Sequence, residues 1–168
     1  MASLLSHPAG PLSILFGSGL KLHRNLILIC VLLSLLPDAD VIAFSFGIPY
    51  ESQWGHRGFS HSIVFALITG LICSFCFKEN KKSVFILATL STLSHPLFDM
   101  LTNGGLGVAL WWPFDTGRYF FPWRPVEVSP IGVGNFIGMR GVQVLFSEFL
   151  ILWLPLMSLS FLTKRLRQ

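Results

Sequence analysis

Long apolar stretches separated by short polar segments dominate the chain. Four of them are long enough to cross a membrane as a helix, since a crossing takes about 20 residues and some take as few as about 17. They run over Asn25–Phe46, His61–Phe77, Ser83–Leu101 and Gly141–Thr163. The pattern therefore predicts four full crossings.

A fifth apolar stretch, Ser3–Leu20, carries no charge apart from that of His7. Glycine and proline interrupt its helical pattern, at Gly10, Pro11, Gly17 and Gly19. It is either a short crossing, a re-entrant hairpin or an interfacial segment. The predicted fold is all-α. It is a polytopic transmembrane helical bundle of four full crossings, in which the Ser3–Leu20 stretch is either a fifth crossing or a re-entrant segment.

The composition agrees with a membrane protein. Of the 168 residues, 52% are hydrophobic and only 12% are charged, and the mean hydropathy is +0.67. A soluble domain carries about 25% charged residues, and a disordered chain combines low hydrophobicity with high net charge. These values exclude both classes and favour one membrane-embedded domain over residues 1–168.

The net charge of +4 does not indicate nucleic-acid binding, because the bases form no single basic face. They lie instead in short groups beside the apolar stretches, and basic residues are enriched in cytoplasmic loops. Eight fall on the predicted inner side, namely Lys21, Arg24, Lys78, Lys81, Lys82, Lys164, Arg165 and Arg167. Four fall outside, at Arg57, Arg118, Arg124 and Arg140. We expect a multi-pass protein of the cell inner (cytoplasmic) membrane with a cytoplasmic C-terminus.

Residues 102–140 form the long outer loop of this topology and are rich in glycine, proline and aromatic residues. Tryptophan and tyrosine favour the headgroup region of a bilayer. The loop is therefore either an aromatic belt at the membrane interface or a lid over a site. Its Asp115, Glu127, Arg118 and Arg124 are most simply solvated.

Ionisable residues within the apolar stretches mark a candidate site, because such groups are costly inside a membrane. The predicted topology brings three separated segments to the outer face, and His7 joins them if the N-terminal stretch also crosses. The seven candidate metal ligands are His7, Asp38, Asp40, His56, His61, His95 and Asp99. A further acid, Glu148 in the last apolar stretch, is expected to pair with a polar group in the bundle or to lie at the end of a span.

Four imidazoles and three carboxylates suit a divalent metal such as zinc, manganese or iron. His95 and Asp99 are four residues apart and share one face if a helix is continuous there, although Pro96 can also mark a helix start between them. Asp38 and Asp40 reach a common point only from an extended or turn backbone, and Pro37 favours such a break.

Seven ligands exceed the four of one closed tetrahedral site. Either two metals, or one metal with a proton-transfer set, accounts for the surplus. The alternative is a proton relay or a buried salt-bridge network without metal. Arg57 lies within the histidine motif, where its planar cation can bind a phosphate or another anion. Asp40 and Arg57 are the predicted catalytic residues, as general base and as the group that stabilises negative charge.

These motifs resemble those of bacterial inner-membrane proteins described as membrane-bound metal-dependent hydrolases, some of which are associated with LexA control. The resemblance covers roughly residues 7–115. It rests on His7, Leu-Pro-Asp-Ala-Asp at 36–40, His-Arg-Gly-Phe-Ser-His-Ser at 56–62, and His95 with Asp99, Thr102 and Gly104. Ser60 stands where the family more often has threonine. The resemblance implies hydrolysis with a bound metal.

The function we expect is that of a metal-dependent hydrolase in which metal-activated water attacks a phosphate-ester or lipid-linked substrate near the outer membrane face. One or two divalent ions, zinc or manganese, would be bound. A non-catalytic membrane protein stabilised by metal, and a transporter of an ion or small solute, are the alternatives.

Overall fold

The computed structural model describes residues 1–20, 23–78, 80–130 and 133–167. Over these residues the protein is all-helical, and the described chain contains no strand beyond two isolated bridge pairs. The main helices are α1 (Ala9–Ser18), α2 (Arg24–Leu35), α3 (Ile63–Cys76), α4 (Lys81–Met100), α6 (Met139–Glu148) and α7 (Leu154–Arg165). The other helical elements are η1 (Leu36–Phe46), η2 (Phe59–His61), α5 (Val133–Phe136) and η3 (Phe149–Trp153). The predicted all-α class is confirmed.

Two continuous helical segments are long and apolar enough to cross a membrane. One joins α2 to the 3₁₀ helix η1 over Arg24–Phe46, with 23 residues and a mean hydropathy of 2.3. The other joins α6, the π-helical turn η3 and α7 over Met139–Arg165, with 27 residues and a mean hydropathy of 1.9. Both coincide with predicted crossings.

The remaining predicted crossings are not confirmed by length and composition. Helix α3 has 14 residues, and at 1.5 Å per residue it measures about 21 Å against a hydrocarbon core of about 30 Å. Helix α1 has only 10 residues. Helix α4 has 20 residues, yet it carries serine, threonine, histidine and aspartate along its buried face. The four-crossing bundle therefore stays a prediction for these segments.

Helix α4 lies at the centre of the fold and packs against α1, α2 and α3. Small residues allow the close approach: a Cβ at Gly70 of α3 would lie 2.0 Å from Oγ1 of Thr89 on α4. Helices α1 and α7 are joined by hydroxyl groups, since Ser13 donates to the Leu156 carbonyl and Ser160 donates to the Ser13 carbonyl, both at 2.8 Å. Small residues and interhelical hydrogen bonds are the usual means of helix association in membranes.

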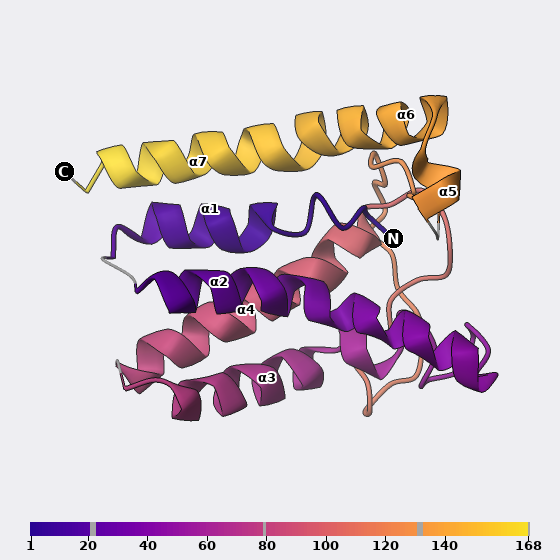
Figure 1. The fold of residues 1–168 in the computed structure, drawn as a ribbon, viewed down its shortest axis with the longest axis horizontal. Coiled ribbons are helices and arrows are strands. Elements are labelled where there is room, and N and C mark those ends of the chain that lie inside the picture. The colour runs from indigo at the N-terminus through magenta and orange to yellow at the C-terminus, as the bar shows by residue number, and fades with distance from the viewer. Residues whose placement is uncertain (21–22, 79, 131–132, 168) are drawn as a thin grey trace.

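The two ends of the bundle differ in character (Figure 1). One end holds the start of α2, the end of α3, the start of α4 and the end of α7. The described bases of the predicted inner side lie on or beside these helix ends, at Arg24, Lys78, Lys81, Lys82, Lys164, Arg165 and Arg167. Lys21, assigned to the same side from sequence, lies outside the described residues. The other end holds the N-terminus, η1, η2 and the segment between α4 and α5.

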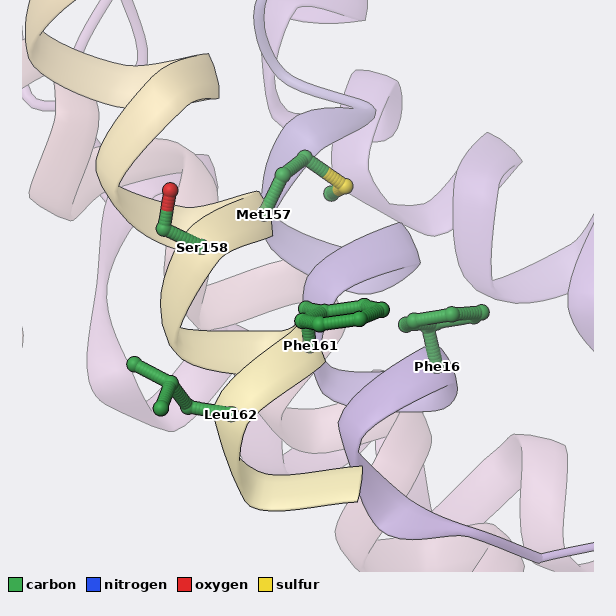
Figure 2. A pocket seen from close by; sticks show the side chains of 5 residues that line it. All are labelled: Phe16, Met157, Ser158, Phe161 and Leu162. Carbon is green, nitrogen blue, oxygen red and sulfur yellow. The ribbon is translucent and has the colours of Figure 1, made fainter. Parts of the chain in front are cut away.

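An apolar groove of about 550 Å³ runs between α1 and α7. Figure 2 shows Phe161 of α7 beside Phe16 of α1, with Met157 one turn away. The groove lies toward the basic end of the bundle, and its lining carries no ionisable group. The candidate chemistry lies at the opposite end.

Candidate metal centre

All seven candidate ligands come together in one buried cluster. His7 precedes α1, and Asp38 and Asp40 lie on η1. The others come from the segment around η2 and from α4, at His56, His61, His95 and Asp99. All seven side chains are buried. The convergence expected from the sequence is thus present in the fold.

His95 and Asp99 share one face of α4, which begins at Lys81 and runs unbroken through Pro96. The alternative that Pro96 marks a helix start between them is wrong. A proline inside a helix removes one hydrogen bond, but the packing of α4 against three other helices holds this helix together.

The tautomer of His95 is set by the end of α2. The His95 Nδ1 atom lies 2.7 Å from the Ser34 carbonyl oxygen, which can only accept, so Nδ1 carries the proton. In the i→i+3 pattern of the 3₁₀ helix that follows, Pro37 has no N–H to donate to this carbonyl. The Nε2 atom of His95 therefore presents a lone pair to the cluster.

The same reasoning applies to His61. Its Nδ1 atom lies 3.1 Å from the Asp40 carboxylate, which fixes the proton there and leaves Nε2 as an acceptor. The Nε2 atoms of His61 and His95 are 3.1 Å apart. Two neutral rings with these tautomers would place lone pairs against each other, so the contact requires either a metal ion between them or one extra proton shared as an Nε2–H···Nε2 hydrogen bond.

Two carboxylates complete this set. Asp38 Oδ1 is 3.3 Å from His95 Nε2 and 3.7 Å from His61 Nε2. Asp99 Oδ2 is 3.6 Å from His61 Nε2. Ligand atoms bound to zinc at about 2.0–2.1 Å in a tetrahedron stand about 3.4 Å apart. Asp38, His61, His95 and Asp99 therefore offer ligand atoms at metal-site spacing.

Several polar side-chain atoms of the cluster are buried without a hydrogen-bond partner, which suits a role as metal ligands. Within the described part of the chain, both nitrogens of His7, both oxygens of Asp38 and Nε2 of His56 are buried without a hydrogen-bond partner. Each such atom costs about 1–3 kcal/mol when nothing binds it. His7 Nε2 faces the second oxygens of both carboxylates, 3.9 Å from Asp38 Oδ2 and 4.0 Å from Asp99 Oδ1. Its ring stacks on His95 with centroids 3.6 Å apart.

Asp38 and Asp40 contact the same two histidines from one 3₁₀ helix, so the expected extended or turn backbone is wrong. Asp38 Oδ1 lies 3.9 Å from His56 Nδ1 and 3.7 Å from His61 Nε2. Asp40 Oδ1 lies 2.7 Å from His56 Nδ1. Its Oδ2 accepts from Ser60 Oγ at 2.6 Å and from the Arg57 amide at 3.1 Å. Asp40, His56 and His61 form a second candidate ligand set.

Arg57 ties the segment after α4 to the cluster. Its backbone is left-handed, with φ of 63°, and its side chain is fully buried. Nη1 donates to the Leu106 carbonyl at 2.6 Å and Nη2 donates to Thr102 Oγ1 at 3.0 Å. Nε lies 2.9 Å from Asp99 Oδ2. The planar guanidinium thus fixes Asp99 and the adjoining backbone together.

Arg118 differs from the solvated residue expected in the outer loop. Its guanidinium donates to four carbonyls, those of Tyr50, Ser52, His56 and Gly107, at 2.9–3.2 Å. Burial lowers the pKa of Arg118 and raises the pKa of Tyr50. Arg118 joins the segment between α4 and α5 to the backbone around His56, and the Tyr50 hydroxyl accepts from the Leu106 amide of that segment. A lone arginine in a loop carries no sequence signal for such a role.

Sequence reasoning also missed Ala2 and Ser3. The Ala2 amide donates to Asp99 Oδ1 at 2.6 Å, and Ser3 pairs with Glu148. The expectation that Glu148 pairs with a polar group in the bundle is confirmed, but nothing in a short N-terminal Met-Ala-Ser stretch identifies that group.

The comparisons with known proteins bear on the whole chain. The model of the YdjM inner membrane protein family matches residues 1–166. The chain belongs to this family. It is also 40% identical over 160 residues to the inner membrane protein YbcI of Escherichia coli K12, with 92% of each chain covered. No solved structure matches significantly. The family is one of inner membrane proteins, as expected, and its name states no reaction.

Proposed function

We propose that this member of the YdjM family is a metal-dependent hydrolase. The observation that carries the proposal is the 3.1 Å separation of two histidine Nε2 atoms, His61 and His95, whose Nδ1 protons are held elsewhere. With Asp38 and Asp99 they supply two nitrogen and two oxygen ligands, a set that suits zinc or manganese.

A second divalent ion is part of the proposal. Asp38 and Asp99 each turn one oxygen toward the His61–His95 pair and the other toward His7. Asp38, Asp99 and His7 would hold this second ion, and paired divalent ions occur in many hydrolytic sites. His56, with its unpaired Nε2, and Asp40 remain candidate ligands.

A bound divalent ion supplies Lewis acidity, which acidifies water and polarises a phosphoryl or carbonyl oxygen. The chain's own residues then set the geometry. Asp40 holds the rings of His56 and His61 through their Nδ1 atoms, and it is the proposed general base. Arg57 holds Asp99, and we assign to its charge the stabilisation of negative charge that develops in the reaction.

The proposed substrate is a phosphate ester or a lipid-linked molecule at the outer membrane face. Exposed aromatic side chains belong to the same end of the bundle as the cluster, including Trp54, Trp111 and Trp123. Such residues favour the headgroup region, where a lipid-linked group would meet the site.

The proposed topology has four crossings, with the basic end and the C-terminus in the cytoplasm. The separation of the bases from the cluster along the bundle supports it. Reporter fusions at Lys81 and Gly105 should report opposite sides of the membrane. Both on one side would refute this topology.

The decisive experiment measures metal content in detergent-purified protein by mass spectrometry. We expect bound metal in the wild type and its loss in His61→Ala and in Asp99→Ala. His23→Ala is the matched control, because His23 is exposed and outside the cluster. Unchanged metal in both site variants would overturn the metal centre. Turnover is then tested with a panel of phosphate diesters and short-chain phospholipids, using His61→Ala as the inactive reference.

One observation favours a structural metal as the second candidate. Four protein ligands close a tetrahedral site, whereas catalytic sites keep a position for water, and the cluster is fully buried. Metal-loaded protein that resists heat better than metal-free protein, yet turns over no substrate in the panel, would favour this alternative.

A further inference from the structure

Glu148 is a buried carboxylate outside the metal cluster. It ends α6 within the apolar segment Met139–Arg165, and only 1% of its surface is exposed. An acid in such a segment is costly unless it has a partner. Both of its oxygens bind Ser3: the backbone amide donates to Oε1, and the hydroxyl donates to Oε2 at 2.6 Å.

Ser3 belongs to a short segment, residues 2–7, that lies directly against the cluster. We call this the N-terminal segment. Its first amide, at Ala2, donates to Asp99 Oδ1, and its last residue, His7, stacks on His95. Ser6 turns the chain between them, donating through its hydroxyl to the Ser3 carbonyl at 2.9 Å. Ser3, Ser6 and His7 are all buried.

The helix that contains Glu148 makes two sets of contacts: Glu148 binds Ser3, and α7 packs against α1. Leu152 is buried, the Leu156 carbonyl accepts from Ser13, and Ser160 donates to Ser13. Glu148, Leu152, Leu156 and Ser160 recur every four residues. On a regular helix of 3.6 residues per turn, positions with this spacing drift gradually around the helix axis. The π-helical turn η3, over Phe149–Trp153, has a wider turn and reduces that drift. π-turns are frequent at functional sites.

We propose that Glu148 is a positioning residue of the metal centre. It holds the N-terminal segment in place, and through that segment it orients the Asp99 carboxylate and the His7 ring while closing the cluster on this side. The inference rests on the proposed metal centre for its effect on metal, but the anchoring of the segment is independent of any metal.

This contact needs two polar atoms on the side chain at position 148. Ser3 presents its amide and its hydroxyl, and each carboxylate oxygen of Glu148 accepts from one of them. Glu148→Gln is a mild change, because its oxygen can accept from the amide while its NH₂ group donates to the Ser3 hydroxyl oxygen. Glu148→Met keeps the length of the side chain and removes both acceptors, so the N-terminal segment should separate from α6.

The first test is chemical labelling of the N-terminal segment. A cysteine at Ala2, which is buried and whose amide is kept, should be protected from a maleimide in a background where the exposed Cys76 is changed to serine. Adding Glu148→Met should raise the labelling rate at least tenfold. Ser3→Ala, which removes one of the two hydrogen bonds, should raise it less. Equal rates in all three proteins would overturn the inference whether or not metal binds.

The second test is cobalt binding, with visible absorption as the readout of ligand geometry. Glu148→Met should bind Co²⁺ about 10–100-fold more weakly, the usual effect of losing a residue that supports ligands, and its spectrum should shift. Glu127→Met is the matched control, because Glu127 pairs with Arg140 at the surface. Cobalt binding with an unchanged affinity and spectrum in Glu148→Met would refute the positioning role. A wild type that binds no cobalt would instead refute the proposed function.

Discussion

Arg57 offers the sharpest test of how the centre is held together. Its guanidinium contacts Asp99, Thr102 and the carbonyls of Gly104 and Leu106. Arg57→Met keeps a long side chain and removes every one of these contacts. If Arg57 chiefly fixes the centre, the folded protein should lose stability before any substrate is considered.

The size of the expected stability loss depends on which partners of Arg57 are left unpaired. Asp99 and Thr102 are fully buried, whereas the contacts to Gly104 and Leu106 are only partly buried, so water can replace those two. Removing one member of a buried ion pair costs about 3–5 kcal/mol. For a chain of this size, each kcal/mol of lost stability lowers the midpoint temperature of unfolding by about 2–4 °C. We therefore expect Arg57→Met to lower the midpoint by about 6–20 °C.

The assay is thermal unfolding in detergent, followed by a fluorescent probe of aggregation or by circular dichroism. Arg124→Met is the matched control: Arg124 is exposed and its guanidinium lies 4.8 Å from the Phe120 ring, a contact worth about 0.5–1 kcal/mol. Arg57→Lys should fall between the two, because it keeps the charge without the planar fork. An Arg57→Met midpoint equal to that of Arg124→Met would refute the reasoning, and lost turnover at full stability would assign Arg57 to substrate binding.

Two further predictions concern other parts of the fold. Asp40→Asn should weaken metal affinity about 10–100-fold in a titration, because an amide cannot accept from all the donors that face Asp40. The metal content at saturation should stay the same. A lower metal content at saturation would instead make Asp40 a ligand. Gly70→Ala should lower the free energy of unfolding by about 1–3 kcal/mol through overpacking against Thr89, while Gly134→Ala, with nothing within 4 Å of its added Cβ, should not; equal midpoints would show that α3 and α4 can move apart.

The convergence of the motifs could be predicted because charge in an apolar segment has few permitted places. Asp38, His61, His95 and Asp99 lie in three separate segments, and the predicted topology alone assigns them to the end where the fold brings them together. The periodicity of a helix also predicted that His95 and Asp99 share a face. These inferences need only segment order and the cost of burying charge.

Other features depend on neighbours that no local pattern identifies. The division of labour between Asp38 and Asp40 follows from the 3₁₀ geometry of η1, which Pro37 is compatible with but does not require. The partner of Glu148 lies 145 residues away, in a segment without a motif. Such contacts arise from tertiary packing, and only the fold reveals them.

The hydrogen bond from His95 to the end of α2 has a consequence for how the site can change. The Ser34 carbonyl that receives it lies four residues before Asp38, in the same continuous helical segment. A movement of this segment would therefore shift the Asp38 carboxylate and release the His95 ring at the same time. The Leu-Pro-Asp motif and the turn before it thus supply one candidate ligand and the means of orienting another.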